Sequence, residues 1–181
     1  MKRLFFSLLA AFSFAIASAQ PATDASVIIS RLQLDNVILL IPPADFVQAQ
    51  FHDAMDYLNP SGQVLEDIFG NSSTPFLVFS NRNFNVAIRS ATPNFVYMGT
   101  GTGNNVMPCS VLEYNLSSNG TGGTNSTPSL WNGLSTTSAP LITGGTYGAA
   151  RPFAVKLRAK PGWNYTGGAY TLGVIVTATQ L

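Results

Sequence analysis

The chain contains one cysteine, Cys109, and one histidine, His52, and this pair is the first place to look for nucleophilic chemistry. A thiol attacks as a thiolate, which needs a base close in space. The two residues lie far apart in the sequence, and the neighbours of Cys109 are mostly apolar. The pattern therefore predicts a packed, inert thiol at a half-buried strand position, and a single cysteine excludes a disulfide within the chain.

Two acidic pairs, Asp53 with Asp56 and Glu66 with Asp67, are of a type that could hold calcium or hydrolyse a glycosidic bond. Neither pair has the alternating Asp/Asn-x-Gly spacing of a cation loop, and neither is flanked by aromatic subsites. Both pairs are therefore predicted to be solvated loop charges.

The run Gly99-Thr100-Gly101-Thr102-Gly103 has the composition of a phosphate-binding loop. It lacks the wider glycine spacing, the lysine and the following helix that such a loop needs, so a hairpin connection is the better interpretation. We therefore predict no catalytic residue, no cofactor site and no metal site, and we do not expect the chain to be an enzyme.

Trp163 and Tyr165 are the remaining candidate contact residues. They follow the turn-like run Lys160-Pro161-Gly162, in the connection before the last predicted strand. If they are exposed there, their rings could stack on sugar rings. In the alternative, one of them folds back as a plug over the end of the domain.

The charge balance excludes one class of partner. Only 9% of the 181 residues are charged, with nine basic and eight acidic side chains. Removing Lys2 and Arg3, which lie in a predicted leader, leaves seven basic against eight acidic residues, a charge of about −1. A nucleic-acid partner is not expected, because such proteins need a basic face to displace counterions.

The N-terminus has the pattern of a secretory signal peptide over residues 1–19. Lys2-Arg3 precede an apolar stretch, and Ala17-Ser18-Ala19 form a small-residue cleavage site. The alternative, an uncleaved anchor, is disfavoured because the stretch is shorter than the roughly 20 residues needed to span a bilayer. We expect export through the periplasm to the extracellular space or outer cell surface, with no membrane span after leader removal.

The rest of the chain has the composition of β structure, with Gly and Pro between short runs of β-branched and aromatic residues. We predict an all-β, immunoglobulin-like or pilin-like antiparallel sandwich with one short helical turn, in a single domain at 27–181 after an extension at 20–26. The predicted strands are 26–41, 75–81, 83–91, 95–98, 106–114, 140–143, 151–160 and 169–180.

Two segments are harder to assign. Residues 45–58 carry apolar side chains at helical spacing, but they also alternate between Phe46 and Asp53, and we favour a strand followed by a helical turn. Residues 117–139 are rich in Ser, Thr, Gly and Asn and are predicted to be a long surface connection.

Alternation within the strands also predicts the core. The inward-facing set comprises Phe84, Val86, Ile88, Phe153, Val155, Leu157, Leu172, Val174 and Val176.

The C-terminal strand carries a resemblance to a known group. The turn Gly167-Gly168-Ala169-Tyr170-Thr171 followed by Leu-Gly-Val-Ile-Val-Thr-Ala-Thr resembles the closing strand of bacterial pilin-like sandwiches of the spore-coat-U and chaperone–usher groups. Asp56-Tyr57 before a turn and Phe-Asn-Val-Ala-Ile-Arg-Ser at 84–90 also resemble small exported sandwich proteins of gliding-type Gram-negative bacteria. The two-cysteine bridge common in such pilins is absent.

The resemblance implies a structural subunit of a cell-surface fibre, with other copies, other fibre subunits and an export chaperone as partners. The predicted strand at 26–41 is long compared with a mean near 5–6 residues, so its first half could pair with a neighbouring subunit. The candidate donor residues are Val27, Ile28, Ile29, Leu32 and Leu34.

Two alternatives remain open at this point. The whole segment could be an ordinary first strand with a bend near Asn36. The protein could also be a monomeric extracellular module that binds carbohydrate or matrix through its exposed aromatic residues.

Overall fold

The computed structural model describes residues 31–42, 46–127 and 130–181. The chain divides into two units, Met1–Leu34 and Asp35–Leu181. Residues 31–34 of the first unit belong to no helix or strand. All the named elements lie in the second unit.

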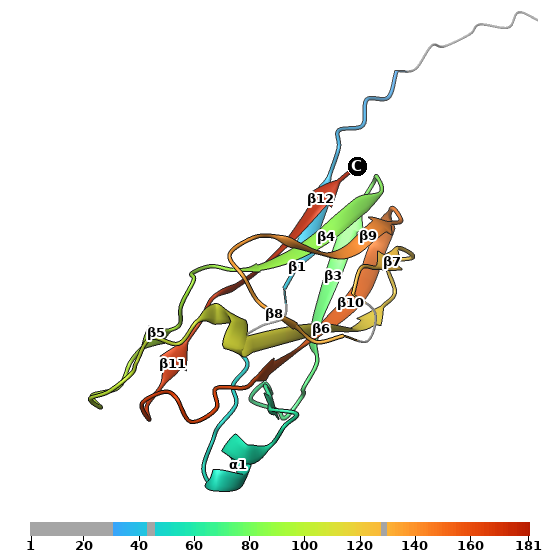
Figure 1. The fold of residues 1–181 in the computed structure, drawn as a ribbon. Helices are drawn as coiled ribbons and strands as arrows, with labels where there is room; N and C mark the ends of the chain where they lie inside the picture. The colour runs from blue at the N-terminus through green and yellow to red at the C-terminus, as the bar shows by residue number, and fades with distance from the viewer. Residues whose placement is uncertain (1–30, 43–45, 128–129) are drawn as a thin grey trace, which may run out of the picture. The chain divides into compact units, whose positions relative to one another are not determined.

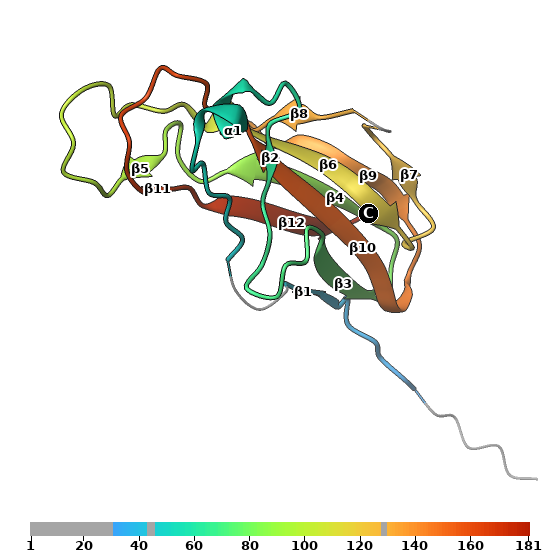
Figure 2. The same cartoon turned by 90° about the horizontal axis from the view of Figure 1, so that it is seen from below.

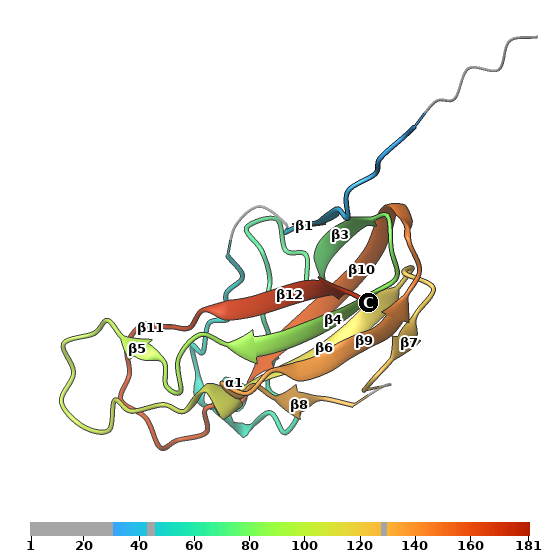
Figure 3. The same ribbon diagram turned by 90° about the horizontal axis from the view of Figure 1, so that it is seen from above.

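The second unit is an all-β antiparallel sandwich with one short helix, which confirms the predicted fold class (Figure 1). One sheet has the strand order β1–β3–β10–β6–β8, with β2 also paired to β10. The other sheet has the order β12–β4–β9–β7 and lies over the first (Figure 3). The first sheet comprises β1 (Ile38–Ile41), β2 (Gln63–Val64), β3 (Thr74–Ser80), β6 (Leu112–Asn119), β8 (Asn132–Gly133) and β10 (Gly148–Ala159). The second comprises β4 (Phe84–Ser90), β7 (Thr124–Asn125), β9 (Ala139–Gly145) and β12 (Val174–Gln180).

Four elements lie outside the two main sheets. Strands β5 (Val96–Tyr97) and β11 (Tyr170–Thr171) pair with each other in a separate two-stranded ribbon. The α-helix α1 (Ala54–Leu58) follows the first strand, and a short 3-10 helix (Cys109–Val111) precedes β6. The ribbon projects from the end of the sandwich at which β12 begins (Figure 2).

The core lies between the sheets and is built by period-two alternation. In β4, Phe84, Val86 and Ile88 are buried, while the residues between them are partly exposed. Phe153 of β10 stacks on Phe76 of β3, with ring centroids 5.0 Å apart. Six of the nine predicted core residues are buried; the other three, Leu172, Val174 and Val176, are only partly buried against the core.

The single strand predicted over 26–41 is wrong for its described part, because only Ile38–Ile41 form a strand. The stretch before β1 is held by side chains instead of a ladder. Asn81 Oδ1 accepts from Val37 N (2.9 Å), Asn81 Nδ2 donates to Asp35 O (2.7 Å), and Gln180 Nε2 donates to Val37 O (2.7 Å). These bonds pair the backbone groups of Asp35 and Val37 at the point where the ladder between β1 and β3 ends.

The strand predicted at 46–53 is also wrong, since this stretch holds only an isolated bridge from Gln48 to Glu66. The helical turn that follows is confirmed as α1. Asp53 Oδ1 accepts from the amides of Met55 (2.8 Å) and Asp56 (3.1 Å). In turn, Asp56 Oδ2 accepts from the Asp53 amide (3.3 Å). This capping box fixes the start of the helix.

Residues 117–139 are not only a surface connection. They complete β6 and contain β7 and β8, and Thr121 and Leu134 are buried. Leu134 is a core residue that the low-complexity composition concealed.

The predicted strand at 106–114 is likewise corrected, because a 3-10 helix over Cys109–Val111 precedes β6.

Candidate functional site

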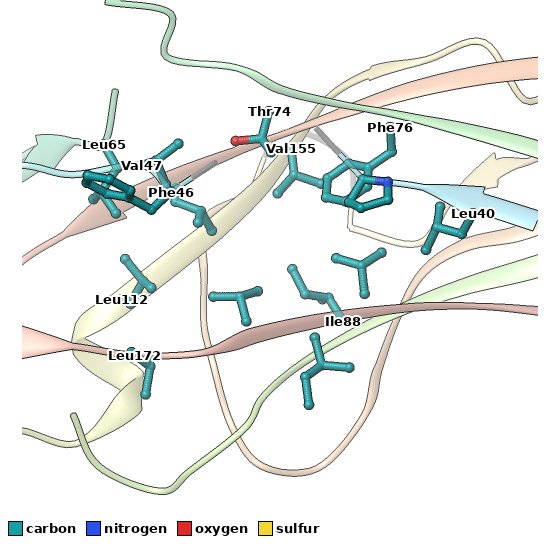
Figure 4. A pocket seen from close by; sticks show the side chains of 15 residues that line it. Leu40, Phe46, Val47, Leu65, Thr74, Phe76, Ile88, Leu112, Val155 and Leu172 are labelled. Carbon is teal, nitrogen blue, oxygen red and sulfur yellow. The ribbon is translucent and has the colours of Figure 1, made fainter. Parts of the chain in front are cut away.

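A groove of about 570 Å³ opens between the two sheets and is lined almost entirely by apolar side chains (Figure 4). Phe76 of β3 and Val155 of β10 line it from one sheet, and Ile88 of β4 lines it from the other. Leu40, Phe46, Val47 and Leu65 lie along one side, and Val174 and Val176 of β12 along the opposite side. Fourteen of the fifteen lining residues are apolar, and the exception is Thr74.

The groove exists because β1 is short. The ladder between β1 and β3 ends where Ile41 pairs with Leu77, whereas β3 begins earlier, at Thr74. Strand β12 lies at the edge of its own sheet, and its first residues, Val174 to Val176, flank the opening. The partly exposed side chains of Leu40, Val174 and Val176 therefore lie at an opening between two strand edges, while Ile88 and Val155 behind them stay buried. Two strand edges beside an apolar opening can accept an extended apolar segment.

The predicted donor residues fall into two groups. Val27, Ile28 and Ile29, together with the predicted leader and extension, lie outside the described residues. Leu32 and Leu34 are described, are in no strand, and are 82% and 76% exposed. Leu32 and Leu34 thus form a short exposed apolar strip at alternate positions.

Trp163 and Tyr165, the predicted aromatic contacts, differ in exposure. Trp163 is 61% exposed and stacks on Tyr57 of α1, with ring centroids 4.7 Å apart and an interplanar angle of 26°. Tyr57 in turn packs against Phe51, with centroids 5.2 Å apart. Tyr165 is partly buried. Trp163 is thus backed by other rings on one face while much of its surface meets solvent.

The loop that carries Trp163 is tied to the β5–β11 ribbon. Asn104 Nδ2 donates to Asn164 O (2.9 Å), and Thr166 N donates to Asn104 O (2.8 Å). Tyr97 Oη donates to Gly167 O (3.1 Å), and Tyr170 Oη donates to Thr166 O (2.7 Å). Burial, and secondarily the neighbouring tyrosines, raise the pKa of Tyr170, so its hydroxyl remains a donor at neutral pH.

The Gly99–Gly103 run is not a hairpin connection, because β5 pairs with the distant β11 instead of the next strand. The Tyr97 hydroxyl accepts from Gly101 N (2.9 Å) and holds the run against the ribbon. A side chain at Gly99 would meet the Tyr97 ring, since an added Cβ lies 2.3 Å from its hydroxyl oxygen. The glycines allow this close approach and have no phosphate-binding geometry to offer.

Cys109 and His52 occupy unlike environments. Cys109 is buried at the start of the 3-10 helix, with Sγ 3.3 Å from Leu134 O. His52 is exposed beside the N-cap of α1. The buried thiol agrees with the prediction of a packed cysteine, although its position in a strand is wrong.

The two acidic pairs stabilise local structure. Asp56 Oδ2 accepts from His52 N (2.7 Å) and Oδ1 accepts from Gln63 Nε2 (2.7 Å). The His52 amide bond is the main reason that the pKa of Asp56 lies below its usual value. Asp67 accepts from Phe69 N and from the amide and side chain of Asn71. The hydrogen bond from the Asn71 side chain is the main reason that the pKa of Asp67 is lowered.

Within residues 31–42, 46–127 and 130–181, no three His, Cys, Asp or Glu side chains gather to hold a metal.

Sequence reasoning missed most of the groove and the rings behind Trp163. Phe46 and Val47 were predicted in a strand that the structure does not contain, and Leu65 lay outside every predicted strand. Tyr57 was noted only as part of a turn motif. Their common signal is a large apolar or aromatic residue in an irregular segment, which pattern analysis assigns to no face.

No protein-family model matches the chain, and no curated protein sequence matches it. Among the described helices, none has the length and apolar character needed to cross a membrane.

Proposed function

We propose that the protein is an exported structural subunit of a cell-surface fibre, in which the N-terminal segment of one copy adds to the groove of the next. The observation that carries this proposal is the apolar groove between β1 and β12, about 570 Å³ in volume. An open apolar surface of this kind is costly to leave in water, so a partner that covers it is favoured.

The proposed occupant is the strip at residues 27–34 of a second copy. It has apolar side chains at Ile28, Leu32 and Leu34, which share one face of an extended chain, and its two described leucines are strongly exposed. Backbone hydrogen bonds to a strand edge would supply affinity, and side chains on one face would fill the groove. Because the strip and the groove are different surfaces, the contact is head-to-tail and can grow into a fibre.

The test uses two complementary defects in the chain that starts at Gln20. Leu32→Asp with Leu34→Asp places charges on the donor strip, and Phe46→Asp places one at the groove, where Phe46 is 64% exposed and its replacement costs little folding energy. Phe69→Asp is the matched control, because Phe69 is 80% exposed and does not line the groove. Light scattering and negative-stain microscopy measure assembly.

We expect oligomers from the unaltered chain and from the Phe69 variant, and monomers from the donor variant. The Phe46 variant should assemble more weakly. A mixture of the donor and groove variants should stop mainly at heterodimers, since each partner retains one working surface. A monomeric unaltered chain at high concentration, or full assembly of the donor variant, contradicts the proposal.

A further inference from the structure

We propose that the exposed face of Trp163 is a stacking platform for a pyranose ring of a neutral, β-linked glycan. This site is separate from the groove, and it does not depend on whether the chain forms fibres. Three observations carry it: the geometry of the ring stack, the bracing of the loop, and the composition around the indole.

The stack leaves one indole face available. The Tyr57 ring lies 4.7 Å behind Trp163 at 26°, so one face of the indole is already covered. The side chain is nevertheless 61% exposed, so indole surface that Tyr57 does not cover meets solvent. Sugars whose hydroxyls are equatorial present a flat face of C–H groups, and such a face suits an aromatic ring of this kind.

The platform is held in place before a ligand arrives. Tyr57 lies on α1, whose first turn is closed by the Asp53–Asp56 capping box and tied to Gln63 by a 2.7 Å bond from Asp56. The loop of Trp163 is held through Asn104 and the hydroxyls of Tyr97 and Tyr170. A rigid aromatic surface loses little conformational entropy when a ligand binds, so a small ligand that makes few contacts can still be held.

The surroundings favour an uncharged polar ligand. Residues 161–169 contain no Asp, Glu, Lys, Arg or His, and Trp163 is their only exposed large apolar side chain. Asn164 is exposed directly after it and can both donate and accept hydrogen bonds. In the chain, the indole is bordered by glycine, asparagine and threonine. Because α1, which carries Tyr57, also exposes Met55 (71%) and Leu58 (61%), the experiment has to separate a sugar from a protein partner.

The experiment exploits the two tryptophans of the chain. The guanidinium of Arg158 lies over the ring of Trp131, with Cζ 4.3 Å from the ring centroid. In the variant Trp131→Phe, Trp163 is the sole indole, so its emission reports on this site alone. Cellohexaose and chitohexaose at millimolar concentration are the probes. Readouts are the emission spectrum, protection from acrylamide quenching, and affinity by calorimetry.

We expect at least one of the two probes to shift the Trp163 emission and to protect it from quenching. Trp163→Ala should weaken binding by about tenfold or more, and Trp163→Tyr should retain part of it. Leu58→Ser is the matched control, because Leu58 is 61% exposed on the same helix as Tyr57. A sugar on the indole should not need Leu58, whereas a protein partner covering this end would use it.

Three results overturn the proposal. The first is the absence of any emission change or quenching protection in the Trp131→Phe variant with both probes. The second is binding that survives Trp163→Ala unchanged. The third is loss of binding in Leu58→Ser equal to that in Trp163→Ala, or self-association that depends on both side chains without a response to sugar, because these results indicate a protein interface.

Discussion

Individual buried side chains determine how firmly the two sheets hold together. Phe153 is 1% exposed and stacks on Phe76 within one sheet, where both rings face the opposite sheet. Burial of a large aromatic ring is one of the strongest single contributions to the stability of a small domain.

Phe153→Ala is therefore expected to lower the free energy of unfolding by about 3–5 kcal/mol, because it removes apolar burial and leaves a cavity. Phe69→Ala makes the same chemical change at a side chain that is 80% exposed, and it should change stability by less than about 0.5 kcal/mol. Urea denaturation of both variants measures the difference. Equal midpoints would mean that Phe153 does not belong to the core.

At the scale of the element, α1 is a five-residue helix whose stability depends on its cap. A helix this short cannot be stable by propensity alone. The carboxylate of Asp56 accepts two backbone amides and the Gln63 side chain, and these bonds favour the ionised form. The helix also carries Tyr57, so the cap supports the surface on which Trp163 rests.

Asp56→Asn is expected to destabilise the protein at neutral pH, and the difference from the unaltered chain should disappear in acid. The pKa of Asp56 is lowered in the folded state, so its ionised form contributes stability above the unfolded value near 3.8. That contribution is lost as the pH falls through the lowered folded pKa. Denaturation at pH 6 and at steps below about pH 4 measures it. A difference that stays constant to strong acid would show that the carboxylate charge is not involved.

At the scale of the whole molecule, side chains connect the two sheets at the end where β12 finishes. Gln180 of β12 donates to Val37 O and also reaches Ser80 Oγ (3.2 Å) and Asn81 Oδ1 (3.1 Å). Asn81 lies between these groups and holds the stretch that leads into β1. This cluster sets where the chain joins the sandwich.

Asn81→Ala is expected to release that stretch while leaving the core intact. The Val37 amide should exchange with solvent at least several-fold faster. Stability should fall by about 1 kcal/mol or more, because three side-chain hydrogen bonds of Asn81, with Val37, Asp35 and Gln180, are lost. Hydrogen exchange resolved by residue measures the effect, with Asn105→Ala in the exposed loop as the control. Unchanged protection at Val37 would show that β1 pairing alone holds the segment.

Local alternation of apolar and polar residues was sufficient to predict the β class and the buried faces of β4 and β10. Period two alone places Phe84, Val86 and Ile88 of β4 on one face. In β10 the register shifts between Ala154 and Val155, so Phe153, Ala154 and Val155 are all buried. The run Asn59-Pro60-Ser61-Gly62 is typical of a turn. The structure has a turn there, in which Gly62 has a positive φ of 72° and its amide donates to Asn59 O (3.0 Å). For the candidate sites, the exposed apolar strip at Leu32 and Leu34 and the aromatic residue Trp163 were visible in the sequence.

Only the tertiary structure decided where β1 begins, and with it where the groove lies. The stretch before β1 carries apolar residues at Leu32, Leu34 and Val37, but Asp35 and Asn36 disfavour a strand, and β3 offers only Leu77–Ser80 as partners. The side chains of Asn81 and Gln180 hold the residues just before β1 instead. Trp163 was predictable as a candidate, but its platform was not, because Tyr57 lies more than a hundred residues earlier in the chain. Strand propensity and side-chain type are local properties, whereas pairing and stacking depend on distant partners that the fold brings together.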